Sequence, residues 1–200
     1  MNIISTVEAE QADARQSALL EAAVGVFARY GFRKTSMEEV AQAAGVSRQG
    51  LYLQFASKED LFRKALEYSL NSQLNAAITA LAVRADSLEV RIIAACNAWA
   101  GRFAGSLGAD AADLMCASTS LAGATLTHFE TRFEAALTGA IADSPLATLC
   151  NSAGMSPADL ARTLHATVRG LKQRSASREE FVKGVTVAAR MYCATLNRRK

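Results

Sequence analysis

Apolar residues recur every three or four positions through most of this 200-residue chain, which is the spacing of an α-helix and not of a β-strand. The longest apolar stripes cover residues 19–27, 61–81, 92–103, 160–171 and 181–196. Polar or glycine-containing breaks separate them. The pattern predicts about nine helices and no strand, so we expect an all-α protein.

Signatures of helix starts fall at the breaks between the stripes. In each of them a hydroxyl side chain is followed either by Glu three positions later or directly by Pro, and both arrangements suit the free N–H groups of a first helical turn. They are Thr35 with Glu38, Ser36 with Glu39, Ser177 with Glu180, Ser144 with Pro145 and Ser156 with Pro157. Gly31 and Gly45 suit helix ends, and Gly123 is expected to separate two helices over 110–121 and 125–142.

Composition narrows the possible classes of protein further. Half of the residues are hydrophobic, only two are proline and the net charge is +3, which argues against disorder, while the 6% aromatic content argues against an all-β fold. Four cysteines without a CxxC pair and two histidines give no zinc-ligand spacing, so we expect neither a metal nor a cofactor. The first residues lack a signal-peptide pattern and no uncharged run is long enough to span a membrane, which predicts a cytoplasmic protein with reduced thiols.

The basic charge lies at one end of the chain. Residues 1–170 hold fourteen Lys and Arg against seventeen Asp and Glu, whereas residues 171–200 hold eight against two. Residues 1–58 are balanced, with six of each sign. The basic surplus is therefore not evidence for a nucleic-acid surface, and we interpret it as a solvated tail that complements the dipole of the last helix.

The stretch 36–55 predicts a helix-turn-helix. Two short apolar faces flank Gly45, and Ala41 lies before the turn. A small residue lets the second helix cross close to the first, a glycine adopts the left-handed turn conformation, and buried aliphatic side chains fix the crossing angle. Such a unit presents its second helix to the major groove of DNA, where Arg48 and Gln49 are placed to read base edges.

A series of short motifs surrounds this unit. They are Phe27-Ala28-Arg29-Tyr30-Gly31-Phe32, Thr35-Ser36-Met37-Glu38-Glu39-Val40-Ala41, Ala44-Gly45-Val46-Ser47, Leu51-Tyr52, Phe55 and Ser57-Lys58-Glu59-Asp60-Leu61. Together, over roughly residues 15–64, they resemble the N-terminal DNA-binding domain of TetR-family transcriptional regulators. The remaining helices agree with the ligand-binding domain of that family in number and length.

The resemblance implies which residues contact DNA. It makes residues 47–54 the recognition helix and assigns phosphate contacts to Thr35 or Ser36, Tyr52 and Lys58. For Thr35 and Ser36 a helix-capping role is equally compatible with the sequence. The full set expected at DNA is Thr35, Ser36, Ser47, Arg48, Gln49, Gly50, Tyr52, Gln54 and Lys58.

Two residues depart from the family pattern. Gly50 stands where a small side chain that touches a base is usual, and Leu53 stands where an aromatic or polar residue is common. Gly50 offers no side chain to a base and costs about 1 kcal/mol of helix stability relative to Ala. A glycine at this position would instead let the backbone approach the groove closely.

The helices beyond residue 60 hold the candidates for an effector site. Aromatic, sulfur and polar residues there suit a ligand cavity between helices, although for each one taken singly ordinary core packing is the better interpretation. The candidates are Tyr68, Cys96, Trp99, Phe103, Met115, Phe129, Phe133, His165 and Arg169. Trp99 is the only tryptophan of the chain and lies among small residues, which makes it the strongest candidate.

The last two helices carry apolar stripes wide enough for a self-pairing face, and the resemblance implies a four-helix dimer interface. The residues expected there are Leu160, Leu164, Val168, Leu171, Phe181, Val185, Ala188 and Tyr192. A two-fold dimer places two recognition helices about one DNA turn apart. We therefore expect a homodimer.

These expectations combine into a DNA-binding regulator that is not an enzyme. We expect a flexible arm over residues 1–11, a helix-turn-helix DNA-binding domain over 12–60, and a ligand-binding and dimerisation domain over 61–200. The resemblance implies a repressor that a small apolar or amphipathic effector releases from double-stranded operator DNA. The helix over 57–82 would link the two domains.

Three alternatives stay open at this stage. A helical enzyme would need a nucleophile and base or a metal set, which two isolated histidines do not suggest. A regulator that senses thiol oxidation would use Cys96 or Cys116. An activator differs from a repressor in no residue of this sequence.

Overall fold

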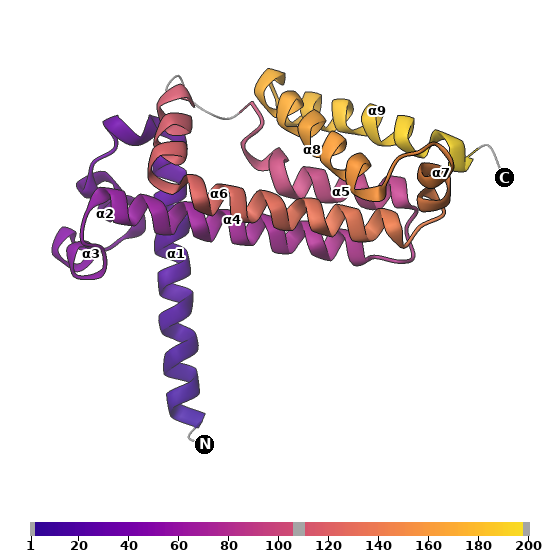
Figure 1. Ribbon diagram of the computed structural model, residues 1–200. Coiled ribbons are helices and arrows are strands. Elements are labelled where there is room, and N and C mark those ends of the chain that lie inside the picture. Colours follow the sequence, from indigo (N-terminus) through magenta and orange to yellow (C-terminus); the bar gives the residue numbers. More distant parts are fainter. Residues whose placement is uncertain (1–2, 106–110, 198–200) are drawn as a thin grey trace. The chain divides into compact units, whose positions relative to one another are not determined.

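The computed structural model describes the backbone of residues 3–105 and 111–197, and the side chains of residues 11–105 and 112–194. Over these residues the chain forms nine α-helices, one short 3₁₀ helix and no strand (Figure 1). The all-α fold predicted from the apolar spacing is confirmed. None of the helices in the described part combines the length and apolar character that a membrane span requires.

The helices follow one another with short connections. They are α1 (Ile3–Lys34), α2 (Met37–Ala44), α3 (Arg48–Gln54), α4 (Lys58–Ala82), α5 (Leu88–Ala100), the 3₁₀ helix η1 (Gly101–Phe103), α6 (Ala111–Ala142), α7 (Leu146–Ser152), α8 (Pro157–Arg174) and α9 (Arg178–Asn197). The Ser156–Pro157 signature is confirmed, because Ser156 caps α8 and Pro157 is its first residue.

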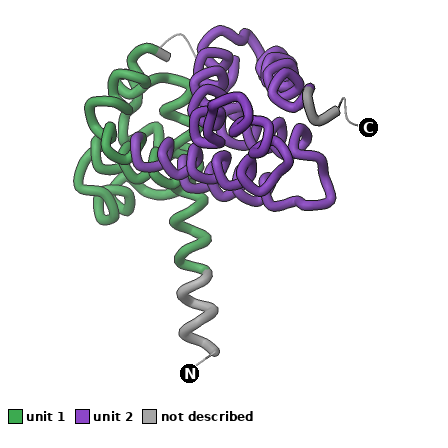
Figure 2. Tube along the Cα trace, turned by 45° about the vertical axis from the view of Figure 1, so that its right-hand side comes forward, with its two compact units in different colours: residues 1–69, 107–126 green, residues 70–106, 127–200 purple. Residues whose placement is uncertain are grey.

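The chain divides into two compact units, each built from two separate stretches (Figure 2). Unit 1 comprises residues 1–69 and 107–126, and unit 2 comprises residues 70–106 and 127–200. Two helices, α4 and α6, contribute to both units. The domains expected from sequence are two continuous stretches that meet at residue 60. The units in the structure are grouped by their contacts, so unit 1 also includes residues 107–126.

Three aromatic rings form the centre of unit 1. Phe62 of α4 packs edge to face against Phe27 of α1 at 5.0 Å and against Phe32 at 5.1 Å between ring centres. Leu51 of α3 and Phe55, the residue that follows α3, are also buried in this unit. Each such side chain contributes roughly 1.5–3 kcal/mol of transfer free energy. This core fixes α1, α3 and α4 around one another.

The first helix is longer than the apolar pattern predicts. α1 begins at Ile3, inside the stretch over which a flexible arm is expected, and its backbone leaves the helical region at Gly31, where φ is 79° and ψ is 175°. Residues 3–12 include Glu, Gln and Ala, which favour a helix without contributing an apolar stripe. The helix expected to end at Gly31 is interrupted at that residue and then continues to Lys34.

The two helices expected on either side of Gly123 form one kinked helix. The backbone of α6 is non-helical at Ala122, with φ of −145° and ψ of 26°, and helical on both sides of it. The glycine was expected to separate two helices, but the chain resumes its helical course after a single irregular residue. This correction matters because α6 thereby joins residues of unit 1 to residues of unit 2.

Candidate nucleic-acid interface

The turn between α2 and α3 has the geometry that the sequence predicts. Gly45 adopts the left-handed conformation with φ of 67°, and the N–H of Val46 donates to the carbonyl of Ala41 at 3.0 Å. A residue with a side chain would be strained at this φ. The turn is followed at once by Ser47, whose side chain accepts the N–H of Gly50 at 2.9 Å and caps α3.

One face of α3 is buried and the other is open to solvent. Leu51 has no exposed area, whereas Tyr52 is 46% and Leu53 is 82% exposed. Arg48, Gln49 and Gln54 are exposed as well. Because the buried residues fix the rotation of the helix about its axis, the exposed face is presented in one orientation. Tyr52 is therefore not a core residue.

Two of the exposed side chains lie next to each other. The guanidinium carbon of Arg48 lies 5.7 Å from the ring centre of Tyr52, one helical turn later. Arg48 also lies 3.8 Å from the carboxylate of Glu38, but both side chains are more than 60% exposed. An exposed pair at that distance contributes little. Arg48 is therefore available to a partner outside the chain.

The absence of a side chain at position 50 has a local cause. A Cβ on Gly50 would lie 3.1 Å from the Oγ of Ser47, the atom that caps α3. That distance is tighter than ordinary van der Waals contact, so a side chain would press on the cap. Glycine at position 50, which departs from the family pattern, therefore fits this helix, because the Ser47 hydroxyl lies close to where a side chain would be.

Ser36 is the N-cap of α2 and is exposed. Its Oγ accepts the N–H of Glu39 at 3.2 Å, and the Glu39 carboxylate accepts the N–H of Ser36 at 2.7 Å. The capping box predicted for this pair is confirmed. The N–H of Ser36 and then its hydroxyl lower the pKa of Glu39. Carboxylate and hydroxyl both lie at the surface, at the start of α2.

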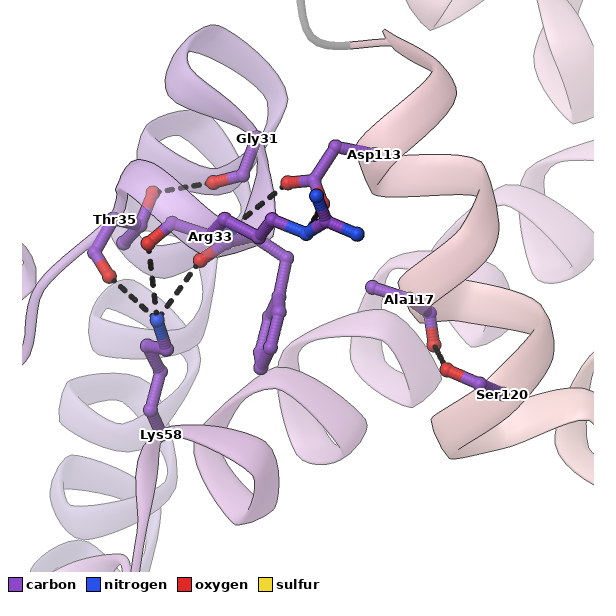
Figure 3. A network of polar contacts seen from close by, with 8 residues as sticks. Gly31, Arg33, Thr35, Lys58, Asp113, Ala117 and Ser120 are labelled. Atoms are coloured by element: carbon purple, nitrogen blue, oxygen red, sulfur yellow. Dashed lines mark hydrogen bonds and ion pairs between the residues drawn. The ribbon is translucent and has the colours of Figure 1, made fainter.

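The side chains of Thr35 and Lys58 are turned inward, which differs from the phosphate contacts predicted for them. Thr35 is 2% exposed, and its hydroxyl donates to the carbonyl of Gly31 at 2.7 Å instead of forming a capping box with Glu38. The ammonium of Lys58 donates to the carbonyls of Phe32 and Thr35, both at 3.0 Å (Figure 3). These side chains close the end of α1, and their phosphate roles are not supported.

A further residue of this unit escapes the sequence analysis. The carboxylate of Asp113, in the first turn of α6, accepts the backbone N–H of Arg33 at 2.8 Å and lies 3.1 Å from the Arg33 guanidinium nitrogen Nε. Eighty positions separate the two residues in the chain. No local signal indicates such a pair. Leu53 is also absent from the set expected at DNA, although it is 82% exposed on α3. Its departure from the family pattern was a signal that could have included it.

Comparison with known proteins supports this arrangement. The sequence model of the bacterial regulatory proteins of the tetR family matches residues 19–65, which contain α2, α3 and the start of α4. Residues 19–65 are therefore similar to the N-terminal domain of that family. An uncharacterised HTH-type transcriptional regulator of Bacillus subtilis, YfiR, is 46% identical over 68 residues, which are 34% of this chain and 33% of that protein. The HTH-type transcriptional repressor KstR2 of Mycobacterium tuberculosis is 40% identical over 58 residues, or 29% of each chain.

The likeness in sequence thus spans about a third of these relatives or less, while the likeness in fold is wider. A solved transcriptional regulator from Rhodococcus sp. Rha1 superposes with a TM-score of 0.66 over 89% of this chain and 95% of that one, at 19% identity. At this identity the comparison concerns the fold alone.

Some of the effector-site candidates come together in unit 2. Trp99 of α5 stacks on Phe133 of α6 with ring centres 4.8 Å apart, and His165 of α8 lies edge-on at 6.3 Å from Trp99 and 5.5 Å from Phe133. The Nδ1 of His165 lies 2.7 Å from the carboxylate of Glu134. Its Nε2 is buried and has no hydrogen-bond partner in the described part of the chain. We name Trp99, Phe133, Glu134 and His165 the aromatic centre.

The other candidates are spread over the chain. Arg169 is exposed and lies 3.6 Å from Glu130, and the Phe103 ring lies 5.9 Å from the ammonium of Lys172. Phe129 and Cys96 are buried. Tyr68 and Met115 belong to unit 1, and Met115 is 50% exposed. The aromatic centre is therefore a smaller group than the set predicted from sequence, and it includes Glu134, which that set omits.

The predicted dimer residues largely fill the core of unit 2 instead. Leu160 is 9% exposed, and the others in this group are at most 1% exposed: Leu164, Val168, Phe181 and Val185. A side chain with almost no free surface cannot also contact a second copy. Leu171, Ala188 and Tyr192 are partly exposed. The large exposed apolar side chains of α9 are Val187 and Met191, at 59% and 75%.

The cysteines differ in exposure. Cys96, Cys150 and Cys193 are buried, and Cys116 is exposed on α6. Burial raises the pKa of Cys96 to about 12 and that of Cys193 to about 11. A thiol that stays protonated is a poor nucleophile. Of the two candidate sensor thiols, Cys116 is accessible and Cys96 is unsuited to oxidation sensing.

Proposed function

We propose that this protein is a TetR-family transcriptional regulator that inserts α3 into the major groove of operator DNA. The observation that carries the proposal is the two-sided exposure of α3, with Leu51 buried and Arg48, Gln49 and Tyr52 open to solvent. Buried contacts hold the helix, and a set of hydrogen-bonding side chains faces outward. Few other roles require this combination on a seven-residue helix.

The exposed groups divide by chemistry. Arg48 can donate two hydrogen bonds to guanine, and Gln49 can form a paired hydrogen bond with adenine. Leu53 offers an apolar surface that suits the methyl group of thymine. The hydroxyls of Ser36, Ser47 and Tyr52 suit phosphate oxygens, which position a protein without reading sequence. Arg48, Gln49 and Leu53 thus form the proposed base-reading set.

Two copies are needed for tight binding. The charge of residues 1–58 is balanced, so attraction to phosphates supplies little affinity to a single unit 1. A two-fold dimer presents two recognition helices to one site, which multiplies their effect. We place the dimer contact on the exposed face of α9 with Val187 and Met191, because most of the residues first expected at the interface are buried within unit 2.

The proposed output is repression that a small molecule relieves. The matched segment of KstR2 belongs to a transcriptional repressor. In this chain α4 and α6 run from unit 1 into unit 2, so a change in either helix reaches both. Relief requires that the effector bind the conformation that does not fit DNA more tightly than the one that does. An effector with equal affinity for both conformations would leave operator binding unchanged.

The aromatic centre is the proposed effector site. Trp99, Phe133 and His165 are at most 7% exposed, so an apolar or aromatic ligand would reach them only where α5, α6 and α8 move apart. The unpartnered Nε2 of His165 would then suit one polar group of the ligand. Trp99 is the only tryptophan of the chain, so its fluorescence reports on this centre alone. A compound that saturates the Trp99 signal should weaken operator binding, and unchanged operator affinity at saturation would refute the release mechanism.

A DNA-selection experiment tests the DNA-binding proposal. The purified full chain is used to select duplexes from a random pool, and binding of the selected duplex is then measured over a range of salt concentrations. Arg48→Ala should cost about 1–3 kcal/mol and relax the preference at one base pair. Tyr52→Phe should weaken binding to all sequences alike, because a phosphate contact carries no sequence information.

Arg63→Ala is the matched control for charge. Arg63 is an exposed arginine on α4 in unit 1, and its guanidinium lies 3.7 Å from the carboxylate of Asp60, three residues earlier in the same helix. Its removal lowers the net charge by the same amount as Arg48→Ala and should leave the base preference intact. Selection of no duplex by the wild type, or full binding by both α3 variants, would refute the proposal.

A further inference from the structure

The connection between α1 and α2 is held from two sides within unit 1. From α4, the Lys58 ammonium donates to carbonyls on both sides of Arg33. From α6, the Asp113 carboxylate accepts the Arg33 N–H at 2.8 Å and approaches the guanidinium at 3.1 Å (Figure 3). We name residues 32–35 the junction. Both of its holders lie on helices that continue into unit 2.

The carboxylate of Asp113 is well suited to hold a backbone. Its side chain is only 16% exposed, whereas that of Arg33 is 84% exposed. A charged acceptor on a backbone N–H is a strong hydrogen bond, and partial burial protects it from competing water. The ion pair with the exposed guanidinium adds less. Asp113 therefore acts mainly on the main chain of the junction.

The junction leads directly into the helix-turn-helix. Ser36, the N-cap of α2, follows it immediately, and α2 is joined to α3 by the turn at Gly45 alone. A change in the direction of the chain at residues 32–35 would therefore reorient α2 and the exposed face of α3 together. Together with the buried side chains of Leu51 and Phe55, an intact junction keeps Arg48 and Tyr52 in a single orientation.

We propose that Asp113 is a positioning residue for DNA recognition, through which the first turn of α6 sets the orientation of the helix-turn-helix. The inference rests on the proposed DNA-binding function. Asp113 lies outside residues 19–65, the segment that the tetR-family sequence model matches. It also gives α6 a connection to the recognition helix that does not pass through α4.

The sign of the effect separates positioning from electrostatics. Removing a carboxylate from a protein that binds a polyanion should tighten binding, because one repulsive charge disappears. Releasing the junction should weaken binding, because only the fraction of molecules with a correctly oriented α3 is competent, and the apparent affinity falls by that fraction. The two accounts of Asp113 predict opposite changes.

The test compares Asp113→Ala and Asp113→Asn with Glu67→Gln, all in the full chain. Glu67 is an exposed acid on α4 in unit 1, and its change removes the same charge away from the junction. Binding of the duplex selected by the wild type should be about tenfold weaker for Asp113→Ala, the loss expected for one charged hydrogen bond. Asp113→Asn keeps an acceptor oxygen, so its affinity for the duplex should lie between those of the wild type and Asp113→Ala. Glu67→Gln should bind the duplex as tightly as the wild type or more tightly.

Two further readouts separate positioning from loss of folding. Binding is measured at a temperature where circular dichroism shows every variant to be folded, and the exchange of the Arg33 amide hydrogen should be faster in Asp113→Ala than in Glu67→Gln. Binding of Asp113→Ala equal to or tighter than that of the wild type overturns the inference, as does unchanged exchange at Arg33. If the wild type itself selects no DNA, the proposed function fails. The exchange measurement at Arg33 still decides whether Asp113 holds the junction.

Discussion

The ammonium nitrogen of Lys58 lies 3.0 Å from the carbonyl oxygen of Thr35. The last carbonyls of a helix have no partner within it, and here a charged donor from α4 supplies one at the end of α1. The same ammonium lies 4.5 Å from the centre of the Phe32 ring. Lys58 thus connects two helices of unit 1, and its charge is engaged before any DNA approaches.

Lys58→Met is expected to lower stability without changing the salt dependence of DNA binding. Methionine keeps much of the length of the side chain but leaves the carbonyls of Phe32 and Thr35 without their donor, which should lower the free energy of unfolding by about 1–3 kcal/mol. Urea denaturation measures this. A lysine that contacted a phosphate would instead reduce the salt slope by about one on removal, with stability unchanged.

Charged substitutions on α9 should separate the proposed dimer. Val187→Asp combined with Met191→Asp places two carboxylates on the exposed apolar face, where their burial in an interface would be costly. Sedimentation is expected to show monomers, and operator binding should fall steeply. Val83→Asp, at an exposed apolar residue outside α9, is the control. A double variant that still sedimented as a dimer would place the interface elsewhere.

A thiol reagent should distinguish the four cysteines of the native protein. Cys116 is exposed and should react, whereas Cys96, Cys150 and Cys193 are buried and should react after unfolding. Burial holds the pKa of Cys96 near 12, so raising the pH to 9 leaves it protonated in the folded state. Mass spectrometry after brief labelling identifies the modified residue. Rapid native labelling of Cys96 would contradict its placement.

Acid should weaken the start of α2. The pKa of Glu39 is lowered below its ordinary 4.5 by the N–H and hydroxyl of Ser36, so the carboxylate stabilises the folded state above about pH 4.5 and loses this effect as the pH falls through the lowered value. Glu39→Gln removes the charge, and its stability should depend less on pH below 4.5. Equal acid sensitivity of variant and wild type, measured by urea unfolding, would contradict the role of the capping box.

Local sequence determined much of the recognition unit. The turn at Gly45 and the caps at Ser36 and Ser47 depend on residues within a few positions of one another, and the apolar spacing located Leu51 on the buried face. Such interactions form wherever the chain is helical, so sequence patterns reveal them. The exposed positions of Arg48 and Tyr52 follow from the same periodicity.

Tertiary structure decided the roles that depend on distant residues. The inward direction of Lys58 depends on the end of α1 lying beside α4, and the contact of Asp113 with Arg33 joins residues eighty positions apart. Likewise, the stripe that contains Leu164 and Val185 was visible in the sequence, but only packing showed that it faces the core of unit 2 and not a second copy. An apolar stripe predicts that one face of a helix is buried. Which surface covers it is determined by the free energy of the whole packed chain, and no local pattern contains that information.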